Sequence, residues 1–362
     1  MSDNHPMSLK DLVFSLLRHG QYFLVYPAAF EKQRPPSIKT PAMKGIPYIA
    51  PLLRTPDGVN LSCYLLPQTK QSLARSYPKK PARRATRAIE DVRVDLTPAA
   101  SQARATVIVF HGNAAHHWED MESAKDFFEM KCNVLLVSYR GYSVSSGSPT
   151  EKGLRIDAQT ALDYVLSEAH LSRAPIILYG HSLGGAVAVD LASRNPSQIS
   201  ALIVANTFTS IPDIVREWPY IGRFSFLCHQ KWRSAAKMRR IPTTTPILML
   251  SGRNDEVVPA KLMDNLWEAA KKRGEKRSSS WHHKSAEKPP ESPTKDLFEH
   301  FENGTHCNIA DLRGYWEAVE DFISNIEGPP DGSDSASPSS TANPRVDIRW
   351  QYIAGHMIVE TK

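Results

Sequence analysis

A serine on a glycine-flanked turn is the residue of this sequence best suited to act as a nucleophile. Gly180-His181-Ser182-Leu183-Gly184 matches the G-x-S-x-G pattern and lies between an apolar run ending at Tyr179 and a run of small apolar residues. A serine on a tight strand-to-helix turn needs glycines on both sides, because a Cβ two residues away would collide with the turn. The alternative is a structural turn in which Ser182 only caps the helix.

This chemistry requires a base, an acid that orients the base, and donors for an oxyanion, because a serine hydroxyl alone is a weak nucleophile. Asp255 lies on a polar loop after one apolar run, and His306 lies on a loop after the next. The chain order Ser, Asp, His is the order of α/β-hydrolases. We therefore expect Ser182 as nucleophile, His306 as base and Asp255 as acid. Each residue taken singly also has a non-catalytic interpretation. Asp255 or Glu256 could be an acid at the start of a helix, and His306 could be a surface histidine.

The oxyanion donors are expected on the backbone. An apolar run opens into the loop His111-Gly112-Asn113-Ala114, and one N–H of this loop can join that of Leu183 to bind the oxyanion. Two nearby imidazoles, His111 and His181, are interpreted as structural. Cys307 stands beside the base, but no further histidine or acid is evident to activate it as a second nucleophile.

The elements that position these residues alternate between short apolar runs and helix-length amphipathic segments. Together with the residue order, this alternation predicts an α/β-hydrolase fold: a mostly parallel central sheet, helices on both faces and a helical cap between strands six and seven. Counted as strands two to eight of that fold, the expected strands are 59–66, 106–110, 133–137, 175–179, 201–205, 246–250 and 297–301. The expected helices are 119–131, 151–168, one that begins near 183, and 259–272.

The chain divides into three parts. Residues 1–40 are expected to form an N-terminal helix or membrane-associating segment, 41–327 the hydrolase domain and 328–362 a disordered tail. Two basic insertions, about 70–104 and 273–295, are expected to be disordered. A cap spans 207–240. Its aromatic side chains are candidates for substrate contact or, taken singly, for the cap's own core: Phe208, Trp218, Phe224 and Trp232.

The positive charge of the chain lies on particular segments. The 362 residues are 41% hydrophobic and 23% charged, with a net charge of +6. Three stretches together carry more net positive charge than the whole chain: 70–104, 207–240 and 271–295. The other residues therefore have a net negative charge. This distribution, without a zinc-finger or RNA-recognition pattern, argues against a nucleic-acid partner. No metal or cofactor is expected, because the four cysteines form no C-x-x-C pair and serine hydrolysis needs none.

Location is inferred from the N-terminal stretch and from glycosylation sequons. The apolar stretch 12–26 is interrupted at 18–21, so it predicts a packed helix or an interfacial anchor rather than a spanning helix or signal peptide. A glycan on the Asn303 sequon would crowd His306, which favours a cytosol-facing protein. A membrane surface is a candidate partner, through peripheral attachment at the endoplasmic reticulum or plasma membrane.

The sequence resembles the bud-emergence (BEM) group of fungal α/β-hydrolases, which is similar to the alpha/beta-hydrolase-domain serine hydrolases of animals. The resemblance covers about 40–327 without the two insertions. It implies Ser182, Asp255 and His306 as the triad, and Asn113 with Leu183 as the oxyanion hole. The motifs that carry it are GHSLGG at 180–185, HGNA at 111–114, YRGY at 139–142, EKGLRIDA at 151–158, TPILMLSG at 245–252 and GTH at 304–306.

The leading functional interpretation is a serine hydrolase that cleaves carboxylic esters or thioesters, with lipid or protein-palmitoyl substrates included, through an acyl-enzyme on Ser182. A serine peptidase on the same triad is an alternative, because the motifs do not separate amide from ester substrates. A second alternative is a non-catalytic, membrane-associated scaffold in cell polarity.

Overall fold

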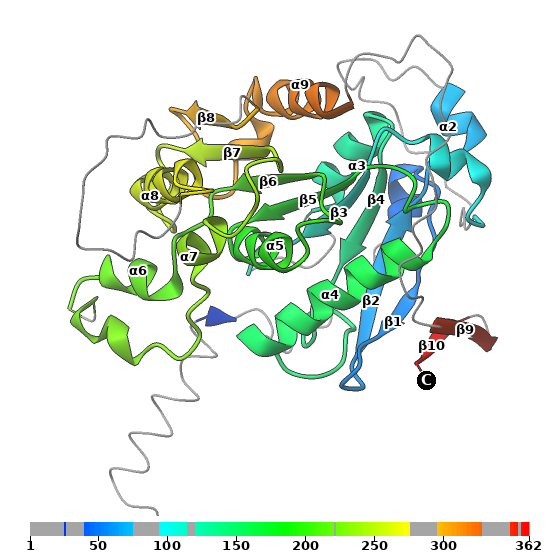
Figure 1. Ribbon diagram of the computed structural model, residues 1–362, viewed down its shortest axis with the longest axis horizontal. Coiled ribbons are helices and arrows are strands. Elements are labelled where there is room, and N and C mark those ends of the chain that lie inside the picture. Colours follow the sequence, from blue (N-terminus) through cyan, green and yellow to red (C-terminus); the bar gives the residue numbers. More distant parts are fainter. Residues whose placement is uncertain are drawn as a thin grey trace, which may run out of the picture.

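A mixed eight-stranded sheet runs through the protein and carries helices on both faces (Figure 1). The computed structural model describes residues 25–26, 40–74, 94–113, 120–220, 222–275, 295–327, 348–353 and 356–361. The strand order is β1-β2-β4-β3-β5-β6-β7-β8. Strands β4 to β8 of this order pair in parallel, whereas β2 is antiparallel to β4 and β1 to β2. The strands are β1 (Leu52–Arg54), β2 (Asn60–Leu66), β3 (Thr106–Phe110), β4 (Asn133–Val137), β5 (Ile176–His181), β6 (Ala201–Ala205), β7 (Ile247–Gly252) and β8 (Leu297–Phe301).

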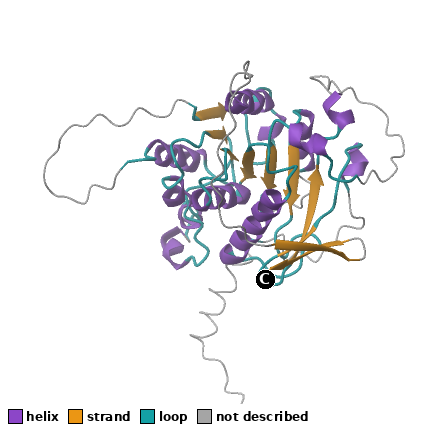
Figure 2. Ribbon diagram, turned by 45° about the vertical axis from the view of Figure 1, so that its right-hand side comes forward, coloured by secondary structure: helices purple, strands orange, loops and turns teal. Residues whose placement is uncertain are grey.

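Two layers of helices cover the sheet (Figures 1 and 2). One face carries α4 (Glu151–Ser167), α5 (Leu183–Arg194) and α8 (Ala260–Lys271). The opposite face carries α3 (Met121–Glu129) and α9 (Tyr315–Glu327). This three-layer arrangement confirms the predicted fold class. Short helical elements complete the body: η2 (Pro41–Lys44), α2 (Lys70–Ala74), η3 (Pro98–Gln102) and η5 (Ile309–Asp311).

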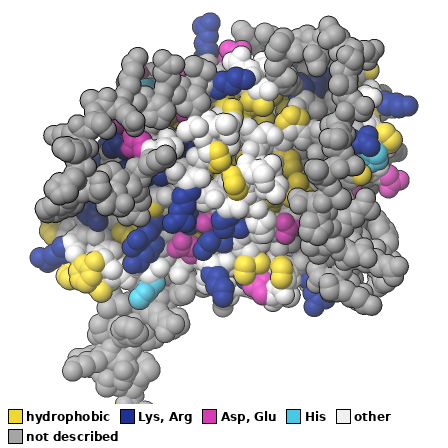
Figure 3. Space-filling view, viewed as in Figure 1, with side chains coloured by type: hydrophobic (Ala, Val, Ile, Leu, Met, Phe, Trp, Pro, Cys, Tyr) yellow, Lys and Arg dark blue, Asp and Glu magenta, His cyan; other side chains and the backbone are white. Residues whose placement is uncertain are grey.

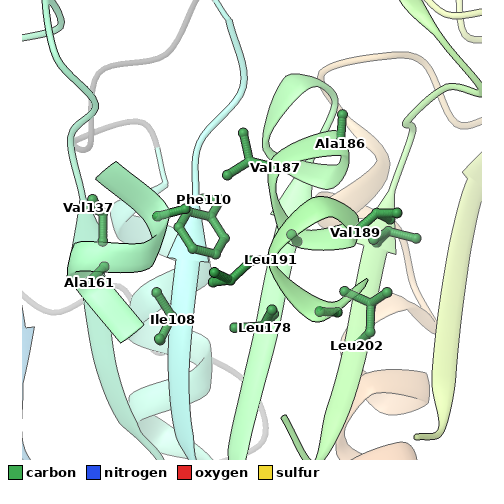
Figure 4. Packing of buried hydrophobic residues seen from close by; sticks show 14 of the residues in the cluster. Ile108, Phe110, Val137, Ala161, Leu178, Ala186, Val187, Val189, Leu191 and Leu202 are labelled. Atoms are coloured by element: carbon green, nitrogen blue, oxygen red, sulfur yellow. The ribbon is translucent and has the colours of Figure 1, made fainter. Parts of the chain in front are cut away.

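The larger core lies between the sheet and the helices α4 and α5 (Figure 4). Every residue of β3, β4, β6 and β7 is buried, as expected for parallel strands covered on both faces. The small side chains of α5, such as Ala186, let this helix approach β3, β5 and β6 closely. Strand residues that point toward the helices include Ile108, Phe110, Leu178 and Leu202.

The excursion between β6 and β7 forms the predicted cap. It contains α6 (Ile211–Arg216), η4 (Gly222–Leu227) and α7 (Ser234–Met238). Lys237 of α7 forms an ion pair with Asp190 of α5, with the two atoms 2.7 Å apart. Because both side chains are largely buried, this pair fixes the cap to the body of the protein.

The prediction that the two basic insertions are disordered is wrong at their ends. In the range 70–104, α2 and η3 are ordered. Lys131 Nζ donates to the Ser72 carbonyl of α2 at 2.6 Å, and Asn133 Nδ2 donates to the carbonyl of buried Ala100 in η3 at 2.9 Å. In the range 273–295, Arg273 is buried and donates to the Pro242 and Thr245 carbonyls at 2.8 Å. These hydrogen bonds of the buried guanidinium join the end of α8 to the segment that leads into β7. Residues 75–93 and 276–294 lie outside the described residues.

The prediction that the tail, 328–362, is disordered is also wrong in part. Strands β9 (Ile348–Ile353) and β10 (His356–Thr361) form an antiparallel hairpin. Both strands contain residue types that favour extended pairing: Ile348, Trp350, Tyr352 and Ile353 in β9, and Ile358, Val359 and Thr361 in β10. The hairpin lies beside β1 (Figure 2). The remaining residues of the range lie outside the described part.

The expected N-terminal segment is described at Val25, Tyr26 and Thr40, so its assignment as a helix or membrane-associating segment otherwise lies outside the described residues. Tyr26 is fully buried against the cap. Among the helices in the described ranges, none is long and apolar enough to cross a membrane.

Substitution of Leu178 by Ala tests the core. The side chain is fully buried in β5, so its truncation leaves a cavity and is expected to lower the free energy of unfolding by about 2–5 kcal/mol. The same change at exposed Leu166 of α4 is expected to cost less than about 1 kcal/mol. Urea unfolding followed by circular dichroism measures both, and equal losses at the two positions would contradict this assignment of the core.

Candidate active site

Ser182 occupies a sharp turn between β5 and α5. Its φ is 54° and its ψ −118°, a combination that costs energy for a residue with a side chain. A Cβ on Gly180 would overlap the Gly184 carbonyl, and a Cβ on Gly184 would overlap the Phe110 carbonyl. The turn therefore requires glycine at both positions, and it presents Ser182 at the carboxyl edge of the parallel strands.

Three of the predicted site residues lie in one hydrogen-bonded row. His306 Nε2 is 3.0 Å from Ser182 Oγ, and His306 Nδ1 is 2.8 Å from Asp255 Oδ2. All three residues are largely buried. In this arrangement the imidazole can take the hydroxyl proton at Nε2 while its Nδ1–H donates to the carboxylate.

The other oxygen of Asp255 is also occupied. Asp255 Oδ1 accepts from the backbone N–H groups of Val257 and Val258, at 2.9 and 2.7 Å. Glu256, the neighbouring acid, instead accepts from the backbone N–H of His306 at 3.3 Å. Of these two acids, Glu256 therefore bonds the backbone of His306, and only Asp255 bonds its imidazole ring.

Asn206 ties the loops of the site together, and sequence reasoning missed it. Its Nδ2 donates to the carbonyls of Thr305 and His306 at 3.0 and 3.3 Å, and its Oδ1 accepts from the Gly252 N–H at 2.8 Å. The side chain thereby joins the ends of β6 and β7 to the loop of His306. Its position directly after β6 was the available signal, since polar residues at the carboxyl ends of parallel strands commonly serve a site.

Sequence reasoning also missed the contacts that Thr207 and His181 make in the site. Thr207 Oγ1 donates to the Ser182 carbonyl at 2.8 Å. His181 Nε2 lies 2.8 Å from the His306 carbonyl, and since the carbonyl only accepts, this nitrogen carries the proton. Desolvation and the neighbouring His306 lower the pKa of His181 to about 4, so the ring is neutral at neutral pH. Its expected structural role agrees with this neutral, donating state.

The two expected oxyanion donors lie on separate elements. Leu183 is the first residue of α5, where a backbone N–H has no acceptor within its own helix. Asn113 follows β3, and its side-chain Oδ1 accepts from the Tyr142 hydroxyl at 2.7 Å. This bond uses the side chain of Asn113 and leaves its backbone for the expected role. His111 is buried and packs on Tyr139, with the ring centroids 4.2 Å apart, which fits a structural residue.

The aromatic cap candidates fall into two groups. Phe208 and Trp232 are buried in the core, and Trp232 is 0% exposed with its Nε1 donating to the Tyr26 hydroxyl at 3.0 Å. Trp232 as a substrate contact is therefore wrong, because the side chain is enclosed in the cap's own core. Trp218 and Phe224 are exposed at 36% and 47%. Within the described ranges, no group of three or more His, Cys, Asp and Glu side chains is arranged to hold a metal ion.

Known proteins share this architecture. A family described as serine aminopeptidase, S33, matches residues 101–240. The protein bem46 of Schizosaccharomyces pombe is 33% identical over 315 residues, which are 86% of this chain and 88% of that protein. A protein of Saccharomyces cerevisiae named an uncharacterized membrane protein is 29% identical over 319 residues, 88% of this chain and 93% of its own.

Solved structures of low sequence identity show the same fold. An esterase from Pyrococcus furiosus has a TM-score of 0.56 at 17% identity, covering 82% of this chain and 97% of its own. An alpha-beta hydrolase from Vibrio vulnificus has a TM-score of 0.57 at 17% identity, covering 89% of this chain and 98% of its own.

The protein is thus an α/β-hydrolase by its fold. The extent and identity of the match to bem46 place it more narrowly: the chain belongs to the BEM group of α/β-hydrolases, which confirms the family recognised in its motifs.

Replacement of His181 by Gln tests the neutral state of this ring. The unfolded chain takes up a proton near pH 6.5 and the folded protein only near pH 4, so the stability that the neutral ring contributes is complete above pH 6.5 and falls as the pH drops toward 4. Gln keeps a donor for the His306 carbonyl but does not titrate. We expect a shallower fall in the free energy of unfolding for His181→Gln than for wild type between these pH values.

Urea unfolding across this range measures the effect, with His300→Gln, a change at an exposed histidine, as the matched control. Equal pH slopes in wild type and His181→Gln would show that the His181 ring is not held neutral.

Proposed function

We propose that this hydrolase cleaves carboxylic esters or thioesters through an acyl-enzyme on Ser182. The observation that carries the proposal is the row from Ser182 Oγ through both nitrogens of His306 to Asp255, with separations of 3.0 and 2.8 Å. This row joins a nucleophile, a base and an orienting acid, and the strained backbone at Ser182 holds the hydroxyl at the strand edge.

In the proposed reaction, Ser182 Oγ attacks the acyl carbonyl carbon and His306 Nε2 takes the hydroxyl proton. The backbone N–H groups of Leu183 and Asn113 bind the oxyanion. His306 then gives its proton to the departing alcohol or thiol, which leaves the acyl group on Ser182. Water, deprotonated by the same nitrogen, releases the acid, while Asp255 stabilises the imidazolium.

The proposed substrates are acyl esters and thioesters, including lipids and acylated proteins. We also propose that the protein works at a cytosol-facing membrane surface, in peripheral attachment to the endoplasmic reticulum or plasma membrane. Support comes from the Saccharomyces cerevisiae relative, which is named a membrane protein, and from the basic cap.

A serine peptidase is the second candidate, because the family that matches residues 101–240 is described as a serine aminopeptidase. The same residues would act, with an amine as leaving group. Parallel assays on an amino-acid p-nitroanilide and a p-nitrophenyl ester separate the two candidates, and a higher kcat/KM for the anilide would favour the peptidase.

Replacement of Ser182 by Ala is expected to lower kcat/KM for p-nitrophenyl esters by about three orders of magnitude or more, because the nucleophile is lost. Cys307→Ser, which changes an exposed thiol beside His306, is expected to leave kcat/KM within about twofold of wild type. Covalent labelling by a fluorescent fluorophosphonate should follow the same pattern.

Esters of increasing acyl length define the substrate. An optimum at long chains supports a lipid or palmitoyl substrate, and an optimum at acetate argues against one. Undiminished hydrolysis by folded Ser182→Ala would overturn the acyl-enzyme, and an inactive, unlabelled wild type would favour the non-catalytic scaffold.

A further inference from the structure

The part of the cap around η4 exposes large aromatic side chains to solvent. We define the cap tip as residues 218–220 and 222–227. Tyr220 is 91% exposed and Phe226 72% exposed, and Trp218 and Phe224 are also exposed. In contrast, the aromatic side chains of the sheet, such as Phe110 and Tyr179, are buried. Exposed aromatic groups that cluster on one short segment mark an interaction surface.

The surroundings of the cap tip are positively charged. The stretch 207–240 holds seven Lys and Arg residues but only two acidic ones. Both acids are paired, because Asp213 forms an ion pair with Arg216, and Glu217 forms one with Lys261. Arg223 lies over the ring of Phe224, 5.2 Å from its centroid. Figure 3 shows hydrophobic side chains beside Lys and Arg side chains on this part of the surface, at the lower left.

The N-terminal part of the chain joins the body at the same cap. The Tyr26 hydroxyl donates to Gln230 Oε1 at 3.0 Å and accepts from Trp232 Nε1 at 3.0 Å. Both partners follow the cap tip closely in the sequence, and Figure 1 shows residues 25–26 beside the cap. The apolar stretch 12–26 therefore ends at the cap rather than at another face of the protein.

We propose that the cap tip docks onto an anionic phospholipid bilayer. Tyr220 and Phe226 enter the boundary between head groups and acyl chains, where aromatic rings are favoured. Arg223 and the other exposed cations of the cap, Arg233, Arg239 and Arg240, bind the negatively charged head groups. The combination of aromatic and basic groups with few free acids favours this occupant over a protein partner.

Docking in this way orients the active site. The cap leaves the sheet directly after β6, and Thr207 at its start donates to the Ser182 carbonyl. Ser182 therefore lies at the edge of the protein that faces the bilayer, and an acyl chain reaches it from the membrane. The inference deepens the membrane association proposed above, but it does not depend on hydrolysis.

Vesicle flotation of the full chain tests the cap tip. Vesicles of equal parts phosphatidylcholine and phosphatidylserine are expected to bind wild type and Ser182→Ala equally well. Replacing both Tyr220 and Phe226 by Ser should weaken binding at least about tenfold, because two apolar groups are lost from the contact. The matched control replaces Met43 and Val144, two exposed apolar residues outside the cap, by Ser and should bind as wild type does.

Hydrogen exchange of the wild type locates the contact independently of the variants. Amides of the cap tip are expected to exchange more slowly with the anionic vesicles than without them, and this protection should be weaker with pure phosphatidylcholine. Wild type that binds no vesicle would overturn both the membrane association and the docking surface. Binding without cap-tip protection, or undiminished binding by Tyr220→Ser/Phe226→Ser, would overturn the docking surface alone. Loss of hydrolysis in Ser182→Ala bears only on the acyl-enzyme.

Discussion

At Ser182 the backbone passes from a parallel strand into a helix through a left-handed conformation, with φ at 54°. An unsupported serine would relax from this strained conformation. It is held from both sides, because the β5 backbone is paired with β3 and β6, and α5 is packed into the core. The Ser182 N–H also donates to the Ala205 carbonyl at 2.9 Å. The stability of the sheet thereby sustains the strain of the turn.

The turn positions Ser182 alone. The site also requires that the loops after β7 and β8, which carry Asp255 and His306, are held close to Ser182. Asn206 supplies much of this connection, because one buried amide joins the end of β7 to the loop that carries His306. His181 adds a second bond to the same carbonyl of His306 from the strand of Ser182 itself. These bonds hold the imidazole between hydroxyl and carboxylate, so preorganisation of the site comes from neighbours that need not touch a substrate.

Much of this organisation could be predicted from the sequence. Buried parallel strands are continuous apolar runs, so the expected ranges of β3, β4 and β6 equal the observed ones, and that of β7 differs by one residue at its start and two at its end. Ser182 and Asp255 follow such runs and His306 follows the short strand β8, which is why the sequence places all three at one edge of the sheet, where the structure brings them together. Asn206 was missed because its role depends on contacts with residues about a hundred positions away. The sequence left Trp232 open between substrate contact and the cap's own core, because a buried and an exposed tryptophan have the same local pattern and its partner Tyr26 lies outside the cap. The apolar stretch 346–359 allowed a strand or a partner-binding peptide, but it was assigned to the disordered tail because low-complexity sequence precedes it.

We propose that Ser182 carries the acyl group during turnover. Mass spectrometry of protein quenched in acid seconds after mixing with a slowly released p-nitrophenyl ester tests this claim directly. We expect a mass increase of one acyl group on the peptide that contains Ser182. Turnover without this adduct, or an adduct on Cys307 instead, would contradict it.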